Sequence, residues 1–153
     1  MDSASQLLYL DDLHVGQRFT SDTASLDDQA ITAFARQFDP QPFHLDPEAA
    51  KRSLFGGLAA SGWHTAAITM RLNGAGLPIA GGIVGMGGEL SWPNPTRPGD
   101  VLRVESEVVE VSPSRSRPDR GTVTVRSETR NQRDEVVQIA TMKLLVPRRP
   151  PVS

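Results

Sequence analysis

The sequence contains no cysteine and few aromatic residues. The absence of cysteine excludes disulfides, thiolate metal sites, iron–sulfur clusters and a cysteine nucleophile, and nothing in it indicates an oxidising compartment. We therefore expect a cytoplasmic protein. Aromatic residues make up 5% and apolar residues 38% of the 153 positions, which is a thin core for one domain that also holds a ligand pocket. Burial against a second copy of the chain would complete such a core.

An excess of one charge and a long apolar run are also missing. The chain carries 16 Lys and Arg against 18 Asp and Glu, so it has no basic field that would hold a nucleic-acid backbone. The first ten residues show no positively charged segment ahead of an apolar stretch, and the chain contains no run of about 18 apolar residues. We expect neither an export signal nor a membrane span, and no nucleic-acid partner.

Apolar periodicity predicts a strand and two helices in the first third of the chain. Residues 13–24 are typical of a turn and a strand, and Asp27 is placed to cap a helix that ends at Asp39. The proline that follows stops this helix, and two prolines limit the freedom of residues 39–45, so we expect a stiff extended loop there. A further short helix is expected over residues 46–53.

The remainder of the chain predicts a buried helix followed by strands. Residues 58–70 are small or apolar on nearly every side, so we expect a helix enclosed by other structure and ended at Asn73-Gly74. The apolar period then changes to two, which predicts an antiparallel meander of four strands at residues 83–92, 102–109, 122–129 and 135–146. The result is a single α+β domain over residues 1–153, with a curved antiparallel β-sheet around a central α-helix and a flexible proline-rich tail at 147–153.

Asp39 and His44 are the first candidates for catalysis. They lie five positions apart in the stiff loop ahead of the buried helix, where a carboxylate and an imidazole could hold one water between them at a fixed separation. General acid/base catalysis requires such an arrangement. The alternative is structural, because an aspartate before a proline commonly makes a turn and a histidine among apolar neighbours commonly packs.

The glycine pair Gly56-Gly57, at the predicted start of the buried helix, is the second candidate. Unpaired N–H groups and the positive end of the helix dipole would face a developing negative oxygen there, such as the oxyanion of a thioester. A close backbone crossing is the alternative interpretation. His14, His44 and His64 show no ligand spacing, so we expect no metal and no cofactor, and we interpret His64 as a packing residue.

Three stretches carry a resemblance to a known family: residues 38–50 (FDPQPFHLDPEAA), 55–65 (FGGLAASGWHT) and 92–100 (WPNPTRPGD). The sequence resembles the MaoC-like dehydratases, the (R)-specific enoyl-CoA hydratase branch of the hotdog fold, over about residues 13–146. The resemblance implies a hotdog domain that dimerises side by side and binds an acyl-CoA or acyl-carrier-protein thioester along the dimer interface. The typical hydratase signature has glycine and asparagine where this chain has Phe38 and Gln41, so the chain is more similar to a subgroup of the family.

By position, the resemblance assigns Asp39 and His44 as the catalytic pair that activates water for attack on C3 of a trans-2-enoyl-CoA. The product is an (R)-3-hydroxyacyl-CoA and the reverse reaction is a dehydration, so the expected enzyme is a hydro-lyase. The resemblance also implies that the Gly57 N–H binds the thioester oxygen and that Thr65 orients the pocket. A hotdog acyl-CoA thioesterase, which would release free thiol, and a non-catalytic acyl-thioester-binding subunit are the alternatives.

Overall fold

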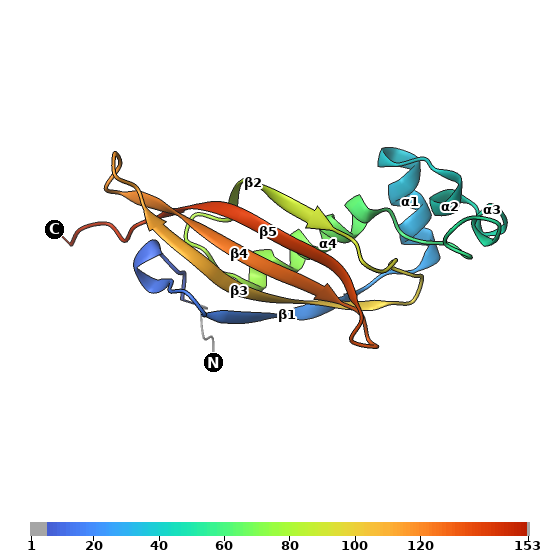
Figure 1. The fold of residues 1–153 in the computed structure, drawn as a ribbon, viewed down its shortest axis with the longest axis horizontal. Helices are drawn as coiled ribbons and strands as arrows, with labels where there is room; N and C mark the ends of the chain where they lie inside the picture. The colour runs from blue at the N-terminus through green and yellow to red at the C-terminus, as the bar shows by residue number, and fades with distance from the viewer. Residues whose placement is uncertain (1–5, 153) are drawn as a thin grey trace.

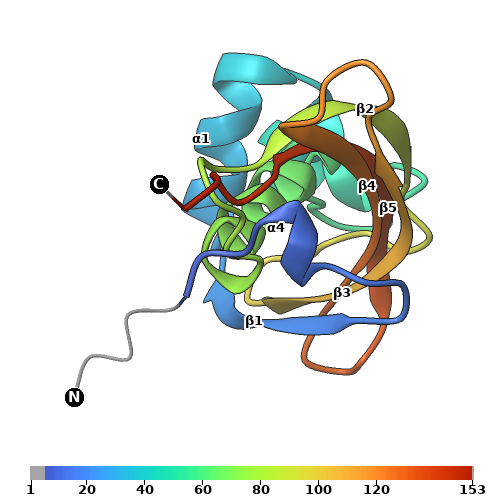
Figure 2. The same ribbon diagram turned by 90° about the vertical axis from the view of Figure 1, so that its left-hand side faces the viewer.

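The computed structural model describes residues 6–152, in which one layer of antiparallel β-sheet curves around one long helix. The strands are β1 (Arg18–Ser25), β2 (Val84–Ser91), β3 (Val101–Pro113), β4 (Arg120–Arg130) and β5 (Val136–Pro147). Figure 1 shows the long helix α4 (Gly62–Gly76) behind the sheet, and the end-on view of Figure 2 shows the sheet bending around it. The predicted α+β class and the hotdog arrangement of a curved sheet around a central helix are confirmed.

The shorter helices gather at one end of the sheet. The turn η1 (Leu10–Asp12) precedes β1, and α1 (Asp28–Phe38), α2 (Pro42–Leu45) and α3 (Pro47–Lys51) lie between β1 and α4 in the chain. In Figure 1, α1 to α3 extend beyond the sheet, at the end of the molecule opposite both termini. We refer to α1, α2 and α3 together as the helical end.

The predicted meander is confirmed for β3, β4 and β5, which pair antiparallel in chain order, but it is wrong for β2. The order in the sheet is β1-β3-β4-β5-β2, so β2 pairs with β5 at one edge and β1 pairs with β3 at the other. An alternating pattern identifies a strand but not its neighbours, which is why the predicted place of β2 is wrong. Because β2 follows a helix that crosses the concave face, the chain re-enters the sheet at its far edge and then returns to β3 through residues 92–100.

Polar caps and prolines determine where the short helices begin. The Asp27 carboxylate accepts a hydrogen bond from the Ala30 N–H at 2.8 Å and begins α1, as the sequence predicts. The predicted extended loop over residues 39–45 is wrong in its second half, because residues 42–45 form one helical turn. Proline is favoured at the first position of a helix, where no N–H is needed, so Pro42 begins this turn instead of preventing it.

The central helix begins later than the sequence predicts. It starts at Gly62, where the Ser61 side chain caps the first turn, and it continues past the predicted stop at Asn73-Gly74. Residues 58–60 instead belong to neither a helix nor a strand, and the last of them donates its N–H to the Thr96 carbonyl at 2.9 Å. Because small residues suit both a helix and a close backbone crossing, composition alone does not separate the two.

One side of α4 faces the sheet and the other faces solvent. On the sheet side, the hydroxyls of Thr69 and Thr129 lie 2.6 Å apart in the interior. On the other side, Trp63 is 58% exposed and Met70 is 47% exposed, and Met86 on the edge strand β2 is 56% exposed. The prediction of a helix enclosed on every side is therefore wrong for a single chain. We refer to the two exposed side chains on α4, Trp63 and Met70, as the apolar strip.

The end of the chain is tied to its beginning. The sequence predicts a flexible tail over residues 147–153, but Arg148 forms an ion pair with Asp11 at 3.0 Å and the next arginine pairs with the neighbouring aspartate. The prediction is thus corrected for these two arginines. Ser153 lies outside the described residues. Residues 1–5, which belong to the segment expected to lack an export signal, also lie outside them. Within the described part of the chain, no helix is long and apolar enough to cross a membrane.

Candidate active site

Asp39 and His44 face one another at the helical end. Asp39 directly follows α1 and His44 lies in α2, and the His44 Nε2 is 3.4 Å from the Asp39 Oδ2. Both side chains are shielded from solvent, being 20% and 7% exposed respectively. The short proline-bounded segment between α1 and α2 thus holds a carboxylate against an imidazole, which is the proximity that the sequence predicts.

The second ring nitrogen of His44 fixes its tautomer. The His44 Nδ1 lies 2.6 Å from the carbonyl oxygen of Ala59, which can only accept, so Nδ1 carries a hydrogen and donates it. In the neutral ring, Nε2 is then unprotonated and faces Asp39. Phe43 meets the imidazole edge-on with ring centroids 4.6 Å apart, and Phe55 lies at 6.1 Å. These contacts give the ring one orientation and leave a proton acceptor beside a carboxylate.

A cavity of about 600 Å³ opens beside His44. Its wall comes from α2, the loop ahead of α4, the first turns of α4 and the connection between β2 and β3, and it includes Phe55, Gly62, Thr65, Trp92 and Arg97. Gly62 is the first residue of α4, and an N–H at that position has no partner within its helix. None of the described residues accepts a hydrogen bond from the Gly62 N–H. The positive end of a long helix therefore meets the cavity that contains His44.

Trp92 packs directly on Gly62. A Cβ atom at residue 62 would lie 2.6 Å from the Trp92 ring, so only glycine permits this approach. The sequence assigns the oxyanion role to Gly57 instead, but Gly57 lies in the loop ahead of α4, does not line the cavity, and uses its carbonyl to accept from Arg97 at 2.9 Å. The signal for Gly62 is a serine cap followed by glycine, which marks the true start of the helix.

Thr65 lies in the cavity wall, as the family resemblance implies. It is 2% exposed, and its hydroxyl is 2.9 Å from the hydroxyl of Thr96 in the connection between β2 and β3. This pair fixes α4 against that connection. The structure therefore brings His44 and Thr65 to the wall of one cavity and places Asp39 3.4 Å from His44, while neither Asp39 nor Gly57 lines that cavity.

A second and smaller cavity, of about 130 Å³, lies farther along α4. Its wall is mostly aliphatic and includes Met70, Leu77, Leu90, Ala140 and Met142. Gln138 also lines it, is 1% exposed, and accepts the indole N–H of Trp92 at 2.9 Å. Because Trp92 lines the larger cavity and Gln138 the smaller one, this hydrogen bond lies between the two.

His64 does not line either cavity. It stacks on Phe34 of α1 with ring centroids 4.5 Å apart, and its Nδ1 is buried without a partner among the described residues. Burial lowers the pKa of His64 below its ordinary value of 6.5, because the charged ring would lose its hydration. Its position fits the packing role that the sequence predicts. Within residues 6–152, no three histidine or acidic side chains converge as a metal site would require.

Comparison with known proteins places this geometry in context. A family model for the MaoC-like domain matches residues 13–131. A crystal structure of a MaoC-like dehydratase from Rhodospirillum rubrum is 65% identical in sequence, with a TM-score of 0.92 over 94% of this chain and 99% of that one. A 3-hydroxybutyryl-CoA dehydratase of Methylorubrum extorquens is 34% identical over 73% of this chain and 71% of that protein. The structure of the R-hydratase PhaJ1 of Pseudomonas aeruginosa is 27% identical, with a TM-score of 0.73 over 95% of each chain.

Proposed function

Because this chain belongs to the MaoC-like domain family, we propose that it is a hydro-lyase that adds water to a trans-2-enoyl-CoA and forms an (R)-3-hydroxyacyl-CoA, or catalyses the reverse dehydration. One observation carries the proposal: the Ala59 carbonyl accepts the Nδ1–H of His44, so the His44 Nε2 faces the carboxylate of Asp39. The relatives named as a 3-hydroxybutyryl-CoA dehydratase and an R-hydratase support the reaction class.

The proposed mechanism uses the pair as acid and base. In the hydration direction, a water molecule donates one O–H to the His44 Nε2 and the other to the Asp39 carboxylate. As the water oxygen bonds to C3, His44 takes the proton and the electron pair of the C2–C3 double bond moves toward the thioester carbonyl. The imidazolium then returns a proton to C2, so one water has been added and the pair is restored. Positioned acid and base groups contribute roughly 10² to 10⁴ in rate.

We assign the stabilisation of the thioester oxygen to the Gly62 N–H instead of the Gly57 N–H. Negative charge develops on that oxygen as the enolate forms, and Gly62 offers a free donor at the positive end of α4 in the wall of the same cavity. One such donor contributes about 10² to 10³ in kcat. Thr65 supports this arrangement by holding the first turns of α4 against Thr96.

The apolar strip supports a homodimer. Its two side chains lie on α4, and β2 is an edge strand whose outer backbone groups have no neighbouring strand among the described residues. A second copy that pairs its own β2 with this one covers the strip and removes the exposed edge. Trp63 of the strip also contacts Trp92 of the cavity wall, with ring centroids 5.4 Å apart, so the thioester would bind along this interface.

A hydration assay over trans-2-enoyl thioesters of increasing chain length, carried on CoA or on acyl-carrier protein, tests the proposal. We expect the absorbance of the conjugated enoyl thioester to fall without release of free thiol, and chiral chromatography to identify the (R)-3-hydroxyacyl product. Release of free thiol would instead identify a thioesterase. Thioester binding without either reaction would identify a non-catalytic subunit, and both results would contradict the proposal.

A further inference from the structure

Arg97 joins the connection between β2 and β3 to the loop ahead of α4. Its guanidinium donates hydrogen bonds to the backbone carbonyls of Phe55 at 2.5 Å, Gly57 at 2.9 Å and Leu58 at 3.3 Å. These carbonyls belong to a stretch without helix or strand, so regular secondary structure provides no donors for them. Arg97 therefore supplies the hydrogen bonds that hold this loop.

The backbone of Arg97 is itself anchored. The carboxylate of Asp100 accepts the Arg97 N–H at 2.8 Å and also accepts a hydrogen bond from the Gln132 side chain at 2.9 Å. Asp100 is 2% exposed and directly precedes β3. Asp100 thus anchors the Arg97 backbone beside the start of β3, and the β-sheet thereby fixes the position of the guanidinium.

The loop that Arg97 holds leads directly to the histidine of the site. The next residue is Ala59, which is fully buried, accepts the Nδ1–H of His44 with its carbonyl at 2.6 Å, and donates its N–H to the Phe43 carbonyl at 3.2 Å. We propose that Arg97 is a positioning residue, which directs the Ala59 carbonyl and thereby sets the tautomer and orientation of His44. The inference rests on the proposed function, in which the His44 Nε2 must be unprotonated.

The chemistry of this contact requires arginine. A guanidinium presents five N–H donors in a rigid plane and can bond several carbonyls at once, whereas the ammonium of lysine is a compact charge on a flexible stem. Arg97 also has no carboxylate ion-pair partner among the described residues, unlike Arg126, which pairs with Glu128. Its bonds to main-chain oxygens are therefore its principal described contacts.

A direct role in substrate binding is the competing interpretation, because Arg97 lines the cavity and carries a positive charge. The two roles predict different kinetics. A residue that contacts the thioester mainly changes KM, whereas a residue that orients the proton acceptor mainly changes kcat. Neither a purely structural role nor substrate contact would alter the tautomer of His44 in the free protein.

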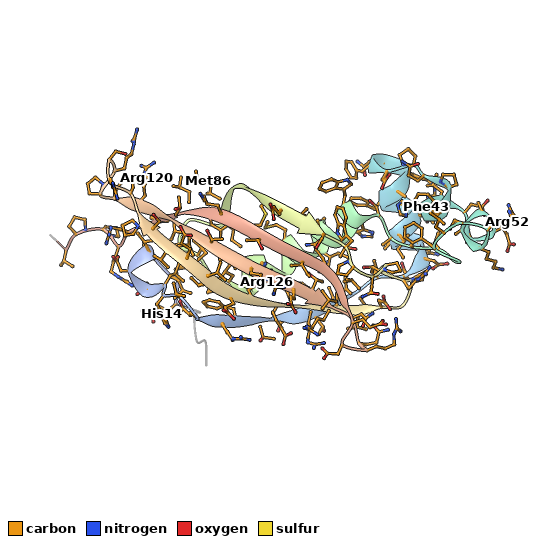
Figure 3. The ribbon with its side chains drawn as sticks, viewed as in Figure 1. His14, Phe43, Arg52, Met86, Arg120 and Arg126 are labelled. Carbon is orange, nitrogen blue, oxygen red and sulfur yellow. The ribbon has the colours of Figure 1, made fainter. Side chains whose placement is uncertain are left out.

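The test compares Arg97→Met and Arg97→Lys with the control Arg126→Met in the full chain. Figure 3 shows Arg126 on the sheet, away from the helical end where Phe43 is labelled. Nitrogen-15 NMR at about pH 8, where an ordinary imidazole is neutral, reports which nitrogen of His44 carries the hydrogen. In both Arg97 variants we expect the Nε2–H tautomer to appear, and kcat to fall about 10-fold to 100-fold with KM changed less than about twofold. The control should match the unmodified protein.

An unchanged His44 tautomer in a folded Arg97→Met protein would overturn the proposal, and so would a rise in KM without a fall in kcat. If circular dichroism shows that Arg97→Met does not fold, the Lys variant decides, because it keeps the charge and most of the side chain. The NMR measurement needs no turnover. If the unmodified protein hydrates no enoyl thioester but the Arg97 variants still change the His44 tautomer, the proposed function is rejected and the positioning role stands.

Discussion

Trp92 donates its indole N–H to the buried side chain of Gln138 across 2.9 Å, and the two residues line different cavities. The larger cavity is lined by His44 and the smaller one mostly by aliphatic side chains. The bond between Trp92 and Gln138 therefore acts as a wall at the far side of the reaction cavity. An acyl chain that ends at this wall is short, and one that passes it enters an apolar space.

Opening this wall should shift the preference of the enzyme toward longer substrates. The double variant Trp92→Phe/Gln138→Leu keeps an aromatic ring near Gly62 and leaves neither partner of the hydrogen bond unpaired. We expect the ratio of kcat/KM for longer over shorter enoyl-CoA substrates to rise about fourfold for each methylene that the smaller cavity admits. Steady-state kinetics over a chain-length series measures this ratio, and an unchanged ratio would show that acyl chains do not reach the smaller cavity.

Removing the charge of Asp39 should abolish most of the activity while the fold persists. Asp39→Asn keeps the shape of the side chain but loses the carboxylate that accepts from water, so kcat is expected to fall about 10² to 10⁴-fold. His44→Ala is expected to lose at least two orders of magnitude as well. Asp28→Asn, at the exposed start of the same helix, is the control and should retain full activity. Near-normal turnover in Asp39→Asn would reject its catalytic role.

Two matched glycine substitutions separate the two candidates for the oxyanion donor. Gly62→Ala keeps the N–H but places a methyl group 2.6 Å from the Trp92 ring, so the start of α4 and its donor must shift. We therefore expect a loss of about 1 to 3 kcal/mol in stability and a large fall in kcat. Gly57→Ala meets only the Arg97 side chain, at 3.5 Å, and should be nearly neutral for both. Thermal unfolding and kinetics measure the two effects. If Gly57→Ala is the variant that loses activity, Gly57 supplies the donor as the sequence implies.

His64 should make the fold less stable in mild acid. Because burial lowers its pKa in the folded state, the unfolded chain binds a proton first as the pH falls. The full contribution to stability is present above the ordinary value of 6.5 and is lost as the pH falls through the lower folded pKa. Denaturant unfolding at a series of pH values should show a weaker acid dependence in His64→Phe. His14→Gln changes an exposed histidine and should leave the dependence as it is.

A charge placed in the apolar strip should separate the proposed dimer. Met70→Lys buries an ammonium against the partner if the strip is an interface, so we expect light scattering to detect a monomer with reduced stability and activity. Val152→Lys changes an equally apolar and more exposed residue outside the strip and should remain dimeric. The thermal midpoint of the unmodified protein should rise with protein concentration. A stable, monodisperse monomer of the unmodified chain would contradict the shared site.

Local patterns in the sequence are sufficient to predict most elements of the fold but not their neighbours. The alternation of residues such as Leu102 and Val104 predicts the strands, and Asp27 predicts the start of α1, because these signals depend on adjacent residues. The place of β2 beside β5 depends on how α4 crosses the sheet, which no local pattern contains. The single turn of α2 is too short to show a helical period.

The site was predictable to a similar extent. Asp39 and His44 are close because the prolines around them restrict a short segment, and that restriction is visible in the sequence. Gly57 lies outside the start of α4 because Ala59 and Ala60 donate their N–H groups to the carbonyls of Phe43 and Thr96, which are distant in the sequence. The Arg97 contacts likewise join distant parts of the chain, since Arg97 and Gly57 are 40 positions apart. Such contacts leave no periodic signal in the sequence.

The helical end is built from segments of 11, 4 and 5 residues that lie beyond the sheet, and it carries His44 in α2 and Asp39 directly after α1, which we propose as the catalytic pair. Small units with little sheet pairing open locally at a lower free energy than the strands they are attached to. Heating should therefore inactivate the enzyme in a first transition that leaves the β-sheet signal in circular dichroism unchanged, and cooling from that point should restore activity. The temperature limit of the reaction is then set by three short helices and not by the sheet.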